Sequence, residues 1–211
     1  MSHQIRRKIV VAIQVSLDGF TEGPFGENEW VESWADAAGL VEDLDAFIVG
    51  GRMYPAYGLH WQGIFEDPEA PAPFMERMPT PQEVDYARKA FGSAHYVMSR
   101  SLEAVEWPPT ATITNISQLQ EIKARKGGNI YVAGGATLIA ALLDAGLVDE
   151  IRLIVHPVAL GRGTGLFADI SNKVHLDLID AKPDPLGRAV LSYRVLAEGD
   201  KRQARDCLKR E

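Results

Sequence analysis

Two kinds of apolar spacing follow each other along the chain. Compact runs rich in β-branched and aromatic residues predict strands, whereas apolar residues that recur every three or four positions predict helices. The strands are expected at residues 8–15, 46–49, 94–98, 130–133, 150–158, 174–181 and 188–196. The helices are expected at residues 29–44, 81–91 and 116–126, and behind Gly135 as far as a cap at Gly146. This order predicts an α/β fold with a mostly parallel sheet and an antiparallel strand pair near its C-terminus.

Two segments fit neither spacing. Residues 55–81 are rich in proline and predict an excursion over the surface or a lid, in which His60 is expected to be solvated. Residues 198–211 form a charged tail. The remaining chain, residues 1–197, is expected to be a single domain.

Paired glycines follow two of the predicted strands. Gly134 and Gly135 separate the strand at 130–133 from a leucine-rich helix, and such a turn directs free backbone amides at a bound anion. A bare strand–helix turn is the alternative, because the complete GxGxxG fingerprint of dinucleotide-binding turns is absent. A second glycine pair, Gly50 and Gly51, follows the strand at 46–49 in the same way. Arg52 comes directly after it, and its five hydrogen-bond donors suit a phosphate. The repetition favours a phosphate or dinucleotide site.

Two other strands end in polar residues that suit a ligand. Ser16, Asp18 and Gly19 follow the first strand, although Asp-Gly is also an ordinary turn. Ser99 and Arg100 follow the strand at 94–98, where hydroxyls and a guanidinium match a phosphate on a ribose. Ligands of open α/β sheets bind outside the carboxyl ends of the strands, so these residues are expected at one site.

Composition and charge limit the classes of partner that the protein is expected to bind. The length of 211 residues and a hydrophobic content of 46% suffice for one core, and no apolar run is long enough to span a bilayer. The formal charge of −7 is scattered, which argues against nucleic acid and favours a small-molecule ligand. The single cysteine, Cys207, excludes a disulfide framework, and no metal-ligand spacing is found. A cytoplasmic protein is expected.

Four landmarks in a fixed order resemble a known superfamily: SLDG, VGGRMY, VMSRS and VAGGATL. The series resembles the dihydrofolate reductase superfamily, and specifically the C-terminal reductase domain of the bifunctional riboflavin-biosynthesis deaminase-reductase. The resemblance extends from about Arg7 to Leu196 and lacks the deaminase domain. It implies a stand-alone oxidoreductase that uses NADPH, acts on a pyrimidine- or pterin-like heterocycle, and forms a homodimer.

The resemblance also implies roles for individual residues. The cofactor would be bound by the residues of three strand ends: Gly50, Gly51 and Arg52; Ser99, Arg100 and Ser101; Ala133, Gly134, Gly135, Ala136, Thr137 and Leu138. The substrate would be contacted by Ser16, Asp18, Gly19, Trp34, Tyr54 and Tyr57. Asp36 is the expected proton donor, by its distance from Gly51 and Arg52, with water or substrate as the alternative source of the proton.

The implied activity is reduction of 5-amino-6-(5-phosphoribosylamino)uracil. No cluster of basic residues is apparent for its phosphate, so reduction of dihydrofolate or another pterin is an alternative. A non-catalytic nucleotide-binding module is a further alternative from a different class.

Overall fold

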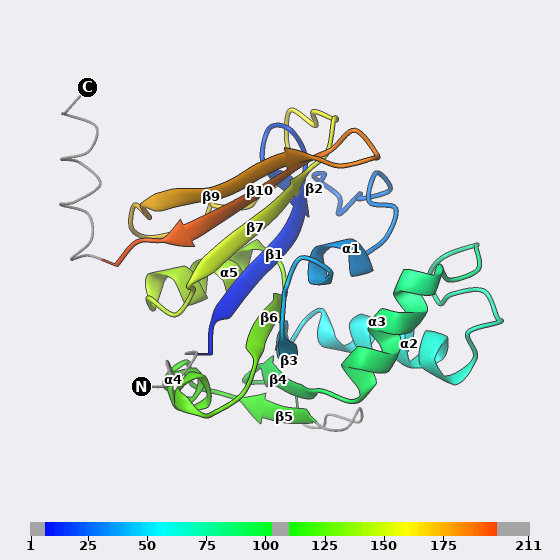
Figure 1. The fold of residues 1–211 in the computed structure, drawn as a ribbon, viewed down its shortest axis with the longest axis horizontal. Coiled ribbons are helices and arrows are strands. Elements are labelled where there is room, and N and C mark those ends of the chain that lie inside the picture. The colour runs from blue at the N-terminus through cyan, green and yellow to red at the C-terminus, as the bar shows by residue number, and fades with distance from the viewer. Residues whose placement is uncertain (1–6, 103–109, 198–211) are drawn as a thin grey trace.

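The computed structural model describes residues 7–102 and 110–197, so the predicted tail at 198–211 lies outside the described residues. An eight-stranded sheet crosses the molecule in the order β5-β4-β3-β6-β1-β7-β10-β9 (Figure 1). Its strands are β1 (Ile9–Val15), β3 (Leu44–Gly50), β4 (Ala94–Met98), β5 (Thr110–Ile113), β6 (Asn129–Ala133), β7 (Glu150–Val155), β9 (Leu176–Pro183) and β10 (Ala189–Val195). The strands from β5 to β7 are parallel, and β10 is antiparallel to both β7 and β9. The predicted mostly parallel sheet with a C-terminal antiparallel pair is confirmed.

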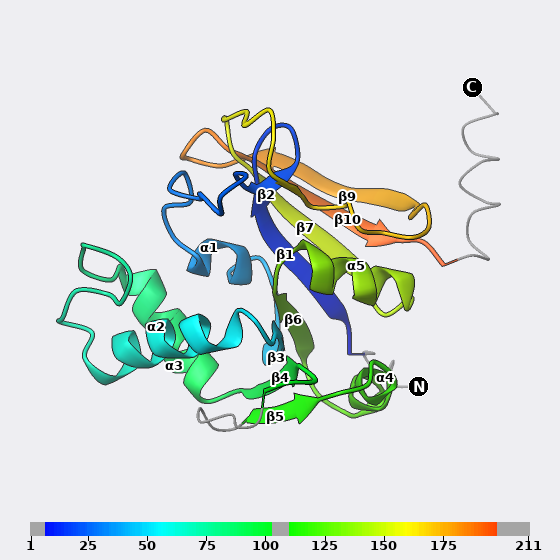
Figure 2. The same ribbon diagram turned by 180° about the vertical axis from the view of Figure 1, so that it is seen from behind.

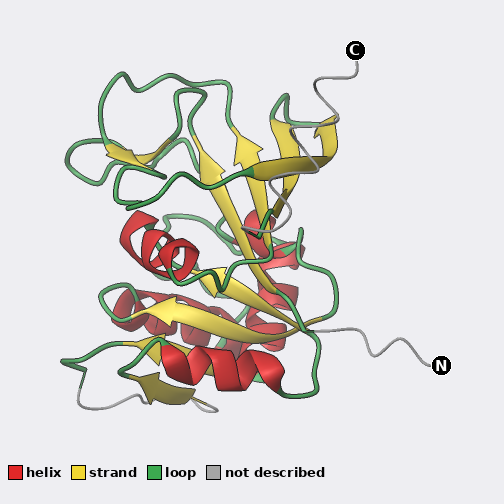
Figure 3. Ribbon diagram, turned by 90° about the vertical axis from the view of Figure 1, so that its left-hand side faces the viewer, coloured by secondary structure: helices red, strands yellow, loops and turns green. Residues whose placement is uncertain are grey.

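Helices cover both faces of the parallel strands. One face packs against α1 (Ala35–Ala38), α2 (Tyr54–Glu66) and α3 (Pro81–Phe91), and the other packs against α4 (Ser117–Ala124) and α5 (Ala136–Asp144), as Figures 1 and 2 show. Alternate side chains of β1 therefore enter two different cores: Val10 lies among the first group of helices and Val11 among the second. The β9–β10 pair projects away from the helices (Figure 3), and the side chains of β9 are mostly exposed. No helix of the described part of the chain is long and apolar enough to cross a membrane.

The predicted helix at 29–44 is wrong over most of its length, because α1 has only four residues. A helix would need the carbonyls of Glu32 and Ser33 for its own backbone, but side chains from elsewhere take them. Gln14 Nε2 donates to Ser33 O at 2.7 Å, and Arg77 donates to Glu32 O at 2.6 Å. Trp30 and Trp34 consequently lie on an irregular segment rather than one turn apart on a helix.

The excursion predicted at 55–81 is also corrected, because its first half is the helix α2. Pro55 lies in the first turn of α2, where its missing N–H costs no hydrogen bond. His60 is on this helix and fully buried, not solvated. Its ring packs edge-on against Trp34 at 4.9 Å, and Nδ1 donates to Pro73 O at 2.5 Å, which fastens the loop behind α2.

Three short strands were not predicted. They are β5 at the far edge of the sheet, and β2 (Phe20–Glu22) and β8 (Thr164–Gly165), which pair with each other as a separate two-stranded sheet. Segments of two to four residues are too short to show a periodicity. Their pairing partners are also far apart in the sequence.

The start of α3 was predicted and depends on a buried carboxylate. Thr80 and Glu83 form a capping box, in which each side chain accepts from the backbone amide of the other. Glu83 is fully buried and also accepts from both terminal nitrogens of Arg77 at 2.8 Å and from Ser33 Oγ at 2.9 Å. Burial alone would raise the pKa of Glu83, but the hydrogen bonds from Arg77, Thr80 and Ser33 lower it to about 2. This single carboxylate thus joins α3 to the segment before α1.

Replacing Glu83 is expected to destabilise the protein strongly. Glu83→Ala leaves Arg77, Ser33 Oγ and the Thr80 amide without their acceptor, and we expect the free energy of unfolding to fall by about 3 kcal/mol. Asp85→Ala on the same helix is the matched control; it removes only an exposed pair with Arg88 and should change the free energy by less than about 0.5 kcal/mol. Urea unfolding of the three proteins measures both values. A loss of similar size in the two variants would contradict the role given to Glu83.

Candidate active site

The carboxyl ends of three parallel strands lie side by side. Gly50, the last residue of β3, is in register with Met98 at the end of β4, and Val49 is in register with Ala133 at the end of β6. The three loops that follow therefore begin at the same edge of the sheet. The residues predicted to bind a cofactor lie in these loops, at the ends of β3 and β6, or at the start of α5.

The first two of these loops are in direct contact. Gly51 N donates to Met98 O at 3.0 Å, and a Cβ atom at Gly51 would lie 2.6 Å from Ser99 Cβ. A side chain at Gly51 would therefore push the loops apart. Ser99 Oγ accepts from the amides of Ser101 and Leu102, which closes the second loop into a tight turn.

The third loop, between β6 and α5, opens toward free space. A Cβ atom at Gly134 would lie 2.5 Å from Leu138, whereas one at Gly135 would meet nothing within 4 Å. The amides of the first turn of a helix have no intrahelical acceptor, and Gly135 caps α5 without a side-chain hydrogen bond to them. Thr137 Oγ1 donates to Asp169 at 3.4 Å, so a carboxylate already lies near this turn. The backbone at Gly135 is therefore accessible, as an anion-binding turn requires.

The cations expected to meet the cofactor lie on the other two loops. Arg52 and Arg100 are exposed and follow Gly51 and Ser99 directly. Their chain positions place both residues just after strands that end at the same edge of the sheet as Gly135. A cationic rim around a backbone cradle suits the phosphates of a dinucleotide.

A cavity of about 350 Å³ lies next to the β6–α5 turn. Six segments of the chain contribute its lining: Ala12, Ile13 and Gln14; Thr21, Glu22, Asn28, Val31 and Trp34; Ala37; Met53, Ala56, Tyr57 and Trp61; Tyr86; Tyr131, Ala133, Gly134, Gly135 and Ala136. Its volume falls in the range of about 300–1,000 Å³ that small-molecule pockets occupy. Of the predicted substrate contacts, Trp34 and Tyr57 line this cavity.

Two of the lining tyrosines belong to a hydrogen-bond chain with one direction. His95 Nδ1 lies 2.9 Å from the carbonyl of Ser93, which only accepts, so Nδ1 carries the proton and Nε2 is an acceptor. Tyr57 OH therefore donates to His95 Nε2 at 3.2 Å, and Tyr86 OH donates to Tyr57 OH at 2.9 Å. The chain runs from the cavity wall inward to β4.

All members of this chain are neutral at physiological pH. Burial raises the pKa of both Tyr57 and Tyr86 well above the ordinary tyrosine value, and it raises the pKa of Tyr131 as well. Burial lowers the pKa of His95 to about 4, although its bond to Ser93 acts in the opposite direction. These groups can position a ligand by hydrogen bonding but do not readily give up a proton to it.

The loop after β1 is tied to the loop after β7. Asp18 accepts from the amides of Leu160 at 3.1 Å and Gly161 at 2.7 Å, and Ser16 Oγ donates to Asp18 at 2.7 Å. The hydrogen bond from Ser16, followed by that from Gly161, lowers the pKa of Asp18 to about 2. Gly19 has a positive φ of 83°, and its carbonyl accepts from Leu166. Ser16, Asp18 and Gly19 thus shape this loop pair, and none of them is among the lining residues of the cavity.

Asp36 and Tyr54 do not enter the cavity either. Asp36 Oδ2 accepts from Arg188 at 2.6 Å, and the same guanidinium also pairs with Asp184 at 2.6 Å. Tyr54 is buried in the core beneath α2. The geometry therefore does not support the proton-donor role predicted for Asp36, since its carboxylate is paired away from the described lining of the cavity.

Several lining residues had not been predicted. Gln14 is the one polar residue in the apolar run of β1, and its side chain lies on the same face of the strand as that of Ala12. A lone polar residue in such a run could have been used to predict a place in the site. Tyr131 has the same parity as Ala133 on β6, so it too was predictable. Glu22 and Tyr86 reach the cavity from β2 and α3, and nothing in the local sequence indicates that placement.

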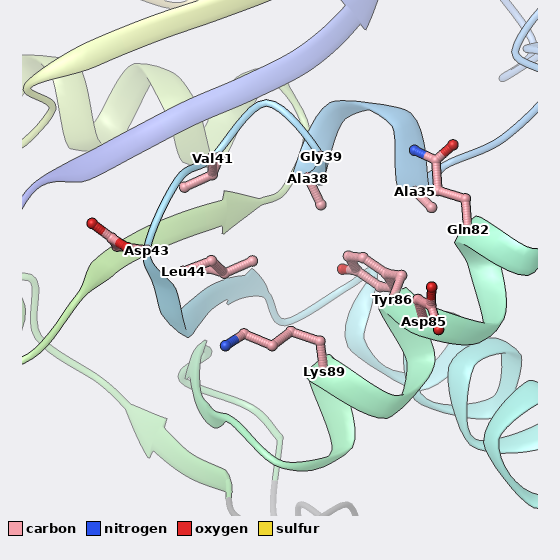
Figure 4. A pocket seen from close by; sticks show the side chains of 10 residues that line it. All are labelled: Ala35, Ala38, Gly39, Val41, Asp43, Leu44, Gln82, Asp85, Tyr86 and Lys89. Atoms are coloured by element: carbon pink, nitrogen blue, oxygen red, sulfur yellow. The ribbon is translucent and has the colours of Figure 1, made fainter.

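A second hollow, of about 400 Å³, lies on the other side of Tyr86 (Figure 4). Its lining includes Asp43, Gln82, Asp85 and Lys89 and lies between α3 and the turn before β3. Figure 4 shows Lys89 extending from α3 along the floor of this hollow. Its described lining includes none of the paired-glycine loops, so we place the candidate active site in the other cavity.

The neutral state of His95 predicts a pH dependence of stability. Its pKa in the folded state, about 4, lies below the ordinary value of 6.5, so the unfolded chain takes up the proton first as the pH falls. The contribution of neutral His95 to the free energy of unfolding is complete above pH 6.5 and is lost between pH 6.5 and pH 4. Between pH 7 and pH 5, His95 should therefore lower the free energy of unfolding by about 2 kcal/mol. Urea unfolding at the two pH values should show a shallower loss in His95→Gln than in the wild type. Equal losses would contradict the assignment.

Comparison with known proteins agrees with this geometry. A dihydrofolate reductase from Enterococcus faecalis complexed with NADP(H) superposes with a TM-score of 0.59 at 12% identity, over 91% of this chain and 98% of that chain. This likeness defines the class of the fold, which is that of dihydrofolate reductase. The sequence pattern of the RibD C-terminal domain matches residues 7–190, and the chain belongs to this family. The predicted family is confirmed.

Two curated relatives show how the family domain occurs. The uncharacterized protein YyaP of Bacillus subtilis is 28% identical over 191 residues, covering 89% of this chain and 95% of YyaP. The riboflavin biosynthesis protein RibD of Escherichia coli is 26% identical over 180 residues, covering 72% of this chain and 49% of RibD. The chain thus spans about half of RibD and nearly all of YyaP.

Proposed function

We propose that this protein is an NADPH-dependent reductase that transfers hydride to a pyrimidine- or pterin-like heterocycle. The observation that carries the proposal is the open β6–α5 turn, which borders directly on an aromatic cavity. Family membership supports a reductase of the riboflavin-biosynthesis or dihydrofolate reductase type. Hydride donors of this kind need little from the protein beyond orientation and exclusion of water.

The residues present fit the cofactor. The amides of Ala136 and Thr137 would bind the pyrophosphate in the space in front of Gly135, and Gly51 with Arg52 would reach the phosphates from the second loop. Ser99 and Arg100 would hold the 2′-phosphate that distinguishes NADPH from NADH. When bound, the cofactor supplies the hydride.

The protein's own residues would place the substrate. Trp34, Tyr57 and Trp61 form an apolar and aromatic wall, in which Trp34 is the partly exposed member against which a flat ring would stack. The directed chain from Tyr86 to His95 fixes the hydroxyl groups of that wall, so their hydrogen-bonding pattern does not change between ligands. The homodimer expected from the resemblance remains part of the proposal.

Removing the guanidinium of Arg100 tests the cofactor assignment. In a titration that follows quenching of tryptophan fluorescence, Arg100→Ala should bind NADPH about tenfold more weakly and NADH within about twofold of the wild type, because only NADPH has the 2′-phosphate. Arg125→Ala removes an exposed arginine at the end of α4 and should leave both affinities unchanged.

Two results would contradict the proposal, one for the role of Arg100 and the other for the reductase as a whole. An equal loss of affinity for both dinucleotides in Arg100→Ala would refute the 2′-phosphate role alone. Failure of the wild-type protein to bind either dinucleotide would overturn the proposed reductase.

A further inference from the structure

The cavity is aromatic and nearly uncharged. Its described lining residues include no lysine, arginine or histidine, and Glu22 is the one carboxylate among them. Burial raises the pKa of the lining tyrosines, which keeps them neutral. A ligand that enters the cavity therefore meets aromatic and other apolar groups, the neutral polar side chains of Gln14, Thr21 and Asn28, and a single carboxylate.

Glu22 is held in place by the small sheet that β2 forms with β8. Thr164 Oγ1 donates to Glu22 Oε1 at 2.9 Å, and the two residues are paired across the strands. Gly163 lies so close to the carbonyl of Glu22 that a Cβ atom there would be 2.1 Å from it. The glycine-rich loop after β7 thereby fixes the strand that carries the carboxylate. Oε2 accepts no hydrogen bond from the described residues.

Two arginines that contact the segments beside Val31 and Ala37 are already paired, whereas Arg52 and Arg100 are exposed on the loops assigned to the cofactor. Arg188 is shared by Asp36 and Asp184, and Arg77 by Glu83 and the carbonyl of Glu32. Both side chains are held by buried or half-buried carboxylates, so releasing either one for a ligand would leave a carboxylate without its partner. A phosphate in the cavity would thus face Glu22 without a compensating cation among the described lining residues.

We propose that Glu22 determines the specificity of the cavity, and that the ligand is a flat nitrogen heterocycle that donates an N–H to Glu22 and carries no phosphate. A charge-assisted N–H···O bond to the carboxylate favours such rings, and like-charge repulsion rejects their phosphorylated forms. The assignment of this ligand as a reductase substrate rests on the proposed function. The proposed ligand differs from the phosphoribosyl substrate that the family resemblance implies, because it carries no phosphate.

The experiment compares one ring with and without a phosphate. Calorimetric titrations use 6-(D-ribitylamino)uracil and its 5′-phosphate with the full chain, both alone and saturated with NADP⁺, which binds without turnover. The proteins are the wild type, Glu22→Gln, and Glu27→Gln as a control that removes an exposed charge of the same loop outside the cavity lining. Thermal unfolding of each variant verifies the fold.

The wild type is expected to bind the unphosphorylated uracil at least tenfold more tightly than its phosphate. Glu22→Gln should reduce this preference to less than about threefold, because it lowers the affinity for the unphosphorylated uracil and raises the affinity for its phosphate. Glu27→Gln should preserve the preference. Equal or tighter binding of the phosphate by the wild type, an unchanged preference in Glu22→Gln, or no binding of either uracil would each overturn the proposal. Titration with NADP⁺ alone reports on the proposed reductase independently, so its failure is distinguished from failure of the ligand assignment.

Discussion

The parallel pairing of β3 with both β4 and β6 is the constraint on which the candidate site depends. Because all three strands point the same way and end in register, three loops separated by up to about eighty positions in the sequence meet at one edge. The contact between Gly51 and Ser99 and the open side of Gly135 both follow from that register. A slip of one residue in either pairing would turn Gly51 and Ala133 toward the opposite faces and separate them.

A second set of contacts holds the substrate side of the site against the sheet. Gln14 accepts from His156 Nε2 at 2.9 Å and donates to the carbonyl of Ser33, whose hydroxyl donates to Glu83. These bonds connect β1 and the end of β7 to α3 through the irregular segment that carries Trp34. The aromatic wall is thus positioned by polar side chains behind it, which is a common way of making a binding site rigid.

The sequence predicted those parts of the fold whose signals are local. The helix at 81–91 and the strand–glycine–helix turn after Ala133 are each indicated by residues close together in the sequence, and the structure has both elements. The helix expected at 29–44 failed because apolar spacing does not reveal that Gln14 takes the carbonyl of Ser33. The ion pair of Asp36 was not foreseen for a related reason, since its partner Arg188 lies 152 positions away. The cavity contributions of Glu22 and Tyr86 likewise depend on long-range packing.

The proposed reductase depends on the turn between β6 and α5, where the cofactor phosphates would bind. Amide hydrogen exchange of the full chain, measured with and without saturating NADPH, tests this most directly. The amides of Gly135, Ala136 and Thr137 should exchange at least tenfold more slowly when NADPH is present, because a phosphate would accept their hydrogens, whereas that of Gly146 at the other end of α5 should not change. Unchanged exchange at the turn, with NADPH present at saturation, would contradict the central claim.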